Sequence, residues 1–134
     1  MGRHEQREQV FKLLFRVEFH SPEDMPEQLK LFLEDRETVI YEKDAAYISE
    51  RYEQVKDKIP ELDQVINDHT EGWDTTRMGK VELAVLRLAT YELLFDEEIP
   101  NSVAINEAVE IAKTYGQENS GAFVNAILAK IVKA

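Results

Sequence analysis

Apolar residues along the chain recur mainly at spacings of three and four, which is the period of amphipathic helices. The clearest case runs from Tyr41 to Ile59, where the apolar positions alternate steps of four and three over about five turns. Glycine and proline are scarce, with five and four in 134 residues. The pattern predicts an all-α chain of about seven helices.

Shorter apolar stripes and end signals predict the other helices. Ser21-Pro22-Glu23 offers a cap and a first-turn proline for the second helix, and Asp74-Thr75-Thr76 offers caps for the fifth. Gly116 suits the left-handed residue that ends the sixth helix. The expected helices lie around residues 10–15, 25–32, 41–59, 62–66, 77–95, 103–115 and 120–131. The short connections predict antiparallel neighbours packed within one domain, residues 1–134.

Two charges interrupt the most apolar stretch, VLRLATYELLF at 85–95, which otherwise looks like a helix at the centre of a bundle. Arg87 and Glu92 point about 140° apart on one helix, so they cannot readily pair with each other. An unpaired buried charge is costly, so each needs a partner elsewhere. We expect Arg87 to bind Glu107, and Glu92 to accept hydrogen bonds from backbone N–H groups near residue 103.

The composition argues against catalysis. There is no cysteine, the three histidines (His4, His20 and His69) lie far apart, and no glycine-rich phosphate loop occurs. We expect a protein that is not an enzyme, with no catalytic residues, no metal and no cofactor. No stretch of about 18 apolar residues occurs, and the first residues lack a signal-peptide core, so a cytoplasmic protein without membrane contact is expected.

The charge is unevenly distributed. The formal net charge is −11, but residues 1–16 carry +2 while residues 17–71 carry −10. Because phosphate binding depends on basic side chains, the N-terminus is the natural place for nucleic acid to bind. Arg3 and Arg7 are also typical of an exposed, frayed chain terminus that binds nothing. Composition alone favours this interpretation over RNA binding.

Three motifs in the C-terminal half resemble the NusB family of bacterial transcription antitermination factors. They are LR-x-A-x-YEL at 86–93, IP before VAINEAVEIAK at 103–113, and FVN at 123–125, within a resemblance that covers about half the chain. The combination is specific, although each motif alone is weak. The resemblance implies a fold of two helical subbundles around a central helix.

It also implies a function. NusB proteins pair with a small-subunit ribosomal protein, called NusE in this role, and the pair binds boxA RNA of nascent transcripts, notably from ribosomal RNA operons. With other Nus factors it helps RNA polymerase read through terminators, and it assists ribosome assembly. By family position, the implied RNA-binding residues are Arg3, His4, Gln6, Arg7, Asn119, Ser120 and Phe123. The implied NusE-binding residues are Phe15, Arg77 and Glu82.

Alternatives remain for single residues and for the whole chain. Phe123 can stack on a base or pack in the core, and Glu82 can be an ordinary solvated acid. A different class of function is a protein-only helical adaptor or homodimer, whose acidic surface binds a basic partner without RNA. A third reading, the RNA-binding part of an RNA methyltransferase, is disfavoured because 134 residues leave no room for a cofactor domain.

Overall fold

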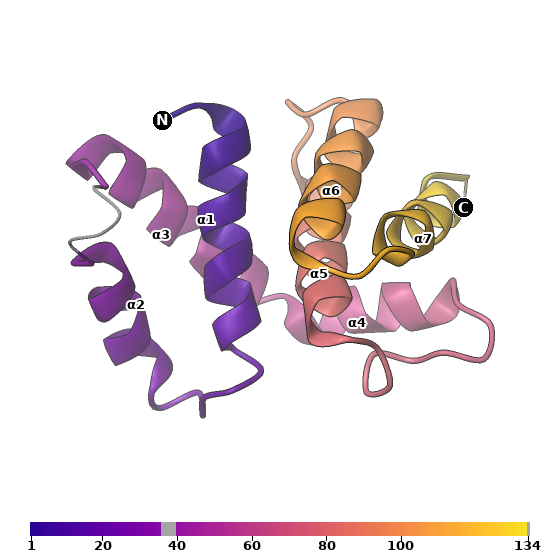
Figure 1. Cartoon of the computed structure of the whole chain (residues 1–134), viewed down its shortest axis with the longest axis horizontal. Coiled ribbons are helices and arrows are strands. Elements are labelled where there is room, and N and C mark those ends of the chain that lie inside the picture. Colours follow the sequence, from indigo (N-terminus) through magenta and orange to yellow (C-terminus); the bar gives the residue numbers. More distant parts are fainter. Residues whose placement is uncertain (36–39, 134) are drawn as a thin grey trace. The chain divides into compact units, whose positions relative to one another are not determined.

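The computed structural model describes residues 1–35 and 40–133, which form seven α-helices and contain no strand (Figure 1). The all-α prediction is therefore confirmed. The chain divides into two compact units, Met1–Asp57 and the residues from Lys58 onward, which agrees with the two subbundles that the resemblance implied. That both form one domain stays a prediction.

The first unit contains α1 (Arg3–Arg16), α2 (Met25–Leu33) and α3 (Glu42–Lys56). Helix α1 packs against both α2 and α3. Apolar residues at helical spacing are buried on each helix: Val10, Phe11, Leu13 and Leu14 on α1, Met25 and Phe32 on α2, and Ile48, Tyr52 and Val55 on α3.

Two helix boundaries in this part of the chain differ from the sequence prediction. Ser21-Pro22-Glu23 does not cap α2 but begins a separate turn, in which the Asp24 N–H donates to the Ser21 carbonyl at 3.0 Å. The helix begins at Met25, with a second proline, Pro26, in its first turn. Helix α3 ends at Lys56. The apolar pattern from Tyr41 to Ile59, which predicted a single helix, therefore runs across a helix end.

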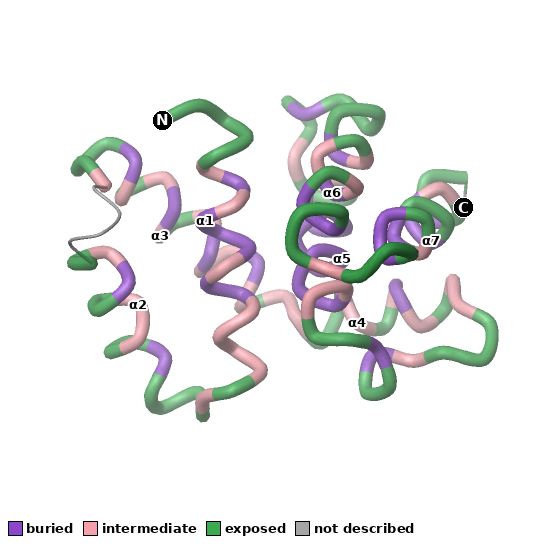
Figure 2. The backbone as a smooth tube through the Cα atoms, viewed as in Figure 1, coloured by how far each residue is buried: buried purple, intermediate pink, exposed green. Residues whose placement is uncertain are grey.

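The second unit contains α4 (Ile59–Asp68), α5 (Lys80–Phe95), α6 (Asn101–Tyr115) and α7 (Ser120–Lys133). Pro60 lies in the first turn of α4, where its missing N–H requires no partner. Helix α5 packs against the other three helices of the unit, and every residue from Leu83 to Glu92 is buried (Figure 2). The prediction of a central helix is confirmed.

Two further end signals were misread. Asp74-Thr75-Thr76 forms a turn of its own, and α5 begins at Lys80. Gly116 has φ −98°, so it is not left-handed; among the described residues only Gly72 has a positive φ, of 76°. Gly116 is needed for close packing instead, because a Cβ there would lie 2.7 Å from the Ala112 carbonyl oxygen.

The structure pairs Arg87 with Asp63 on α4, a residue that the sequence pattern did not single out. The Arg87 Nε and Nη2 atoms donate to the two Asp63 carboxylate oxygens at 2.9 and 2.8 Å. Arg87 is buried and the Asp63 side chain is 21% exposed. The charge inside the apolar helix therefore ties α5 to α4. A contact between Arg87 and Glu107 stays a prediction, as does the backbone partner of Glu92, which is 2% exposed.

Replacing Thr90 by valine is expected to stabilise the protein. The Thr90 hydroxyl on α5 is fully buried and has no hydrogen-bond partner among the described residues. Valine has the same shape without the unpaired polar group, so the free energy of unfolding should rise by about 1 kcal/mol. Urea denaturation measures this change. Tyr52→Phe is the matched test on α3. Burial raises the pKa of Tyr52 to about 12, and its hydroxyl has no hydrogen-bond partner within residues 1–35 and 40–133. A loss of stability in both variants would contradict the argument.

No helix in residues 1–35 and 40–133 is long and apolar enough to cross a membrane.

Candidate nucleic-acid interface

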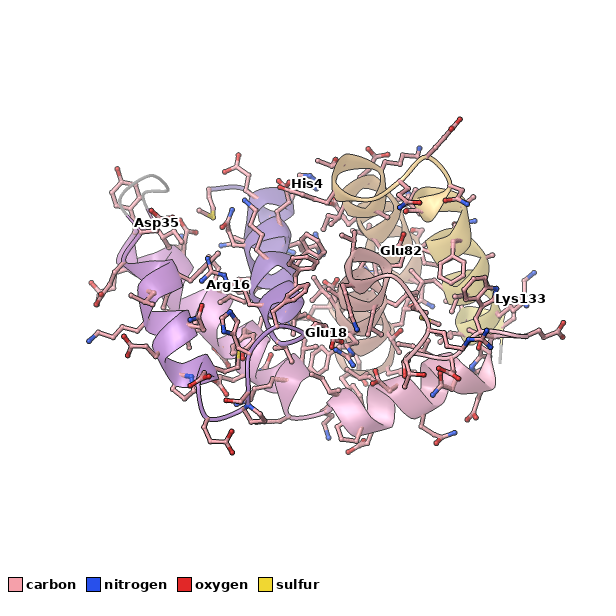
Figure 3. All side chains as sticks on the ribbon, turned by 60° about the horizontal axis from the view of Figure 1, so that its bottom comes forward. His4, Arg16, Glu18, Asp35, Glu82 and Lys133 are labelled. Atoms are coloured by element: carbon pink, nitrogen blue, oxygen red, sulfur yellow. The ribbon has the colours of Figure 1, made fainter. Side chains whose placement is uncertain are left out.

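The residues predicted to bind RNA lie in two places, of which the first is the start of α1. Arg3 and His4 are exposed there, and Figure 3 labels His4 at this end of the helix. His4 Nε2 lies 3.5 Å from the Glu8 carboxylate, one turn along. Arg7 is only 6% exposed. The accessible cation nearest the positive end of the helix is therefore Arg3.

Gln6 is held by a contact within the first unit. Its Nε2 atom donates to the Asp44 carboxylate of α3 at 2.9 Å. This hydrogen bond, together with the nearby Met1 ammonium group, keeps the pKa of Asp44 below its usual value, so Asp44 is ionised at neutral pH. Gln6 thus ties the start of α1 to α3. Any RNA contact would use its second amide N–H or its carbonyl oxygen.

The second place is a pocket of about 260 Å³ in the second unit, which we call the Trp73 pocket. It brings together three of the predicted RNA-binding residues, Asn119, Ser120 and Phe123, at the start of α7. It also contains Glu82, which was predicted to bind the protein partner. The complete lining is Trp73, Met78, Gly79, Glu82, Gln117, Asn119, Ser120 and Phe123.

Glu82 is not an ordinary solvated acid. It projects from α5 toward the start of α7 (Figure 3), and the Ser120 hydroxyl donates a hydrogen bond to its Oε1 atom. The Ser120 hydroxyl oxygen in turn accepts the Gln117 N–H at 2.8 Å. This chain of hydrogen bonds fixes the carboxylate against the first turn of α7. Binding of the protein partner by Glu82 stays a prediction.

Sequence reasoning did not select Trp73, the single tryptophan of the chain. Its ring packs edge-to-face on Phe123 with centroids 6.1 Å apart, and the residue remains 53% exposed. Phe123 is half-buried, so it belongs to the pocket wall as much as to the core. The available signal was an isolated tryptophan beside a glycine in a polar loop.

The loop that carries Trp73 is braced by side chains. Gly72 supplies the positive φ, and the Thr70 hydroxyl donates to the Trp73 carbonyl oxygen. The Asp74 carboxylate accepts hydrogen bonds from the Thr76 hydroxyl and the Thr76 N–H, which lower the pKa of Asp74, as does the charge of Arg77. Asp74 is therefore ionised at neutral pH, and these hydrogen bonds brace the backbone that carries Trp73.

The other residues predicted to bind the partner do not share this pocket. Phe15 lies on α1 between Phe11 and Phe19, with ring centroids at 6.2 and 4.9 Å, and Phe19 is 59% exposed. Arg77 is exposed in the loop before α5, where its N–H donates to the Asp74 carbonyl at 3.0 Å. Within the described residues, no three acidic or histidine side chains lie close enough to hold a metal ion.

Comparison with known proteins identifies the family. A model of the NusB family matches residues 4–133. This chain belongs to the NusB family. It is 49% identical over 130 residues to the transcription antitermination protein NusB of Agathobacter rectalis, covering 97% of this chain and 98% of that protein. It is 44% identical to NusB of Lachnoclostridium phytofermentans, over 98% of this chain and 99% of that protein.

Solved NusB structures share the fold. NusB of T. maritima matches with a TM-score of 0.88 and 42% identity, over 99% of this chain and 92% of that one. A structure of the antitermination factors NusB and NusE in complex with double-stranded RNA matches with a TM-score of 0.83 and 27% identity, over 99% and 98%. The family that the sequence motifs predicted is therefore confirmed.

Proposed function

We propose that this protein is an RNA-binding transcription antitermination factor. In this proposal it pairs with a ribosomal protein acting as NusE, and the pair binds boxA RNA of nascent transcripts, notably from ribosomal RNA operons. The complex then acts on RNA polymerase together with other Nus factors. The observation that carries the proposal is the match, over nearly the whole chain, to a NusB that was solved with NusE and RNA.

The charges of the chain explain why two proteins would be required. With a net charge of −11, the protein repels RNA over most of its surface but attracts a basic ribosomal protein. The exposed Arg3 at the positive end of α1 supplies one phosphate contact, with His4 beside it. The partner contributes the remaining positive charge, so RNA affinity is expected to rise when the partner binds.

The decisive experiment measures binding of a labelled boxA-type RNA with and without NusE, beside a scrambled RNA of equal length. Arg3→Ala is expected to weaken binding by the complex about 3- to 10-fold at low salt and to reduce the slope of log K against log salt by about one. Lys30→Ala on α2, which also removes an exposed cation, is the matched control and should change neither value. Arg3→Ala is preferred to a variant of Arg7, whose burial would confuse binding with folding.

The outcomes separate the competing functions. Selective retention of boxA RNA that tightens with NusE supports the proposal. If NusE binds but no RNA is retained selectively, and retention does not depend on salt, the chain is a protein-only adaptor or homodimer. In that case Arg3 is only a surface residue.

A further inference from the structure

We propose that Asp44 on α3 is a positioning residue for RNA binding, which holds the start of α1 so that Arg3 and His4 are ordered before RNA arrives. This inference rests on the proposed function. It also gives Gln6 a different role from the one that family position implies, because Gln6 then acts on RNA through Asp44 and not by direct contact. Nothing in the sequence pattern selects Asp44, which lies 38 positions from Gln6.

Both carboxylate oxygens of Asp44 bind groups at the start of α1. The Gln6 Nε2 atom donates to Oδ1 at 2.9 Å, and the Met1 ammonium nitrogen lies 3.4 Å from Oδ2. Asp44 is only 7% exposed, so water competes weakly for these contacts. The hydrogen bond from Gln6 is the main cause of the lowered pKa of Asp44, so the acceptor is charged at neutral pH, which strengthens the bond.

The first turn of α1 is weakly anchored by its own residues. Its N-cap is Gly2, which has no side chain to accept a backbone N–H, and a Cβ atom there would meet nothing within 4 Å. Arg3, His4 and Glu5 are exposed, and the first buried apolar side chain of the helix is Val10, about two turns beyond Arg3. Helix ends of this kind fray. The hydrogen bond to α3 therefore lies where the helix needs support.

The residue that Asp44 holds also closes the first helical turn. The Gln6 N–H donates to the Gly2 carbonyl oxygen at 3.0 Å, and the turn between them carries Arg3 and His4. RNA that binds an ordered turn loses less affinity to the entropy of ordering than RNA that binds a frayed one. The contact between α1 and α3 is therefore expected to raise the RNA affinity of the complex.

The same carboxylate argues against a phosphate contact by Gln6. A phosphate within hydrogen-bond reach of the Gln6 amide would also lie close to the charge of Asp44, and like charges repel. Electrostatics alone therefore predict that removing the Asp44 carboxylate tightens RNA binding. A positioning role predicts weaker binding instead, so the sign of the change separates the two explanations.

The test measures binding of a labelled boxA-type RNA by the complex of the whole protein with NusE, over a series of salt concentrations. Asp44→Ala and Gln6→Ala are each expected to weaken binding about 3- to 5-fold, and the double variant no further, because all three lose the same hydrogen bond. The slope of log K against log salt should stay unchanged, since no phosphate contact is lost, whereas Arg3→Ala reduces it by about one.

Two variants separate the hydrogen bond from the charge. Asp44→Asn keeps an oxygen that accepts from Gln6 but removes the charge, so binding should stay within about twofold of that of the unmodified protein. Glu42→Ala removes an exposed acid two residues away on α3 and should not weaken binding. Hydrogen exchange followed by mass spectrometry should become faster in Asp44→Ala at residues 3–9 but not at residues 10–16, because only the first turns are released.

Three results would overturn the inference while the proposed function stands. Unchanged or tighter binding by Asp44→Ala shows that only the charge of Asp44 reaches the RNA. An additive double variant, or a loss in Gln6→Ala that Asp44→Ala does not share, shows that Gln6 contacts RNA directly. Faster exchange throughout α1 in Asp44→Ala shows that the contact supports the fold in general. If the unmodified complex retains no RNA selectively, the proposed function fails, and the inference fails with it.

Discussion

Asp63→Ala is expected to reduce the free energy of unfolding by about 2–4 kcal/mol, because it leaves Arg87 without its bidentate carboxylate. Arg87 is only 7% exposed, so water replaces the lost carboxylate only in part. The partial exposure of Asp63, 21% for its side chain, places the expected value below that of a fully buried pair. Urea denaturation followed by far-ultraviolet circular dichroism measures the loss.

The double variant Asp63→Leu/Arg87→Met is the control for this prediction. It removes both charges and keeps apolar volume, so most of the lost stability should return. If the double variant is as unstable as the sum of Asp63→Leu and Arg87→Met made singly, the two side chains do not act as a pair. If Arg87→Met left stability unchanged while binding to NusE was lost, the arginine would serve partner binding and not the fold.

Gly116→Ala is expected to destabilise the protein by about 1–3 kcal/mol and to disturb the Trp73 pocket. Its Cβ atom would lie 2.5 Å from the Ser120 hydroxyl oxygen and 2.7 Å from the Ala112 carbonyl oxygen. Relief of this overlap must move the start of α7, and with it the hydrogen bond from Ser120 to Glu82. Thermal unfolding measures the stability, and the ¹⁹F resonance of 5-fluorotryptophan at position 73 reports on the pocket.

Two variants isolate the cause of the Gly116 effect. Gly79→Ala meets only the flexible end of Glu82, so its stability should change by no more than about 0.5 kcal/mol. Gly116→Ala in a Ser120→Ala background should remain destabilised, because the backbone carbonyl of Ala112 is still in the way. Normal stability of that double variant would assign the whole effect to the Ser120 side chain.

The candidate site was only partly visible in the sequence. Family position selected Asn119, Ser120 and Phe123, and the structure brings all three into one pocket with Glu82. Family position did not select Trp73, Gly79 or Gln117. These residues come from the loop before α5 and the turn before α7, more than thirty positions apart in the chain, and only packing of the helices joins them.

The four polar residues at the start of α1 differ in exposure more than the sequence pattern predicts. Arg3, His4, Gln6 and Arg7 looked like one polar cluster at a positive helix end. In the structure Arg3 and His4 are exposed, Gln6 donates to Asp44, and Arg7 is buried. Residues three and four apart share a helix face, but which face is covered depends on the neighbouring helices.

The family, the all-α class and the central position of α5 can be read from the amino-acid sequence alone. Helical period is a local property, repeated every three or four residues, so it can be read along the chain. Three features are visible only in the folded chain: the pairing of Asp63 with Arg87, the close packing at Gly116, and the contact of Trp73 with Phe123. Each of these depends on the distance between elements that are separate in sequence, and a one-dimensional pattern does not contain that distance.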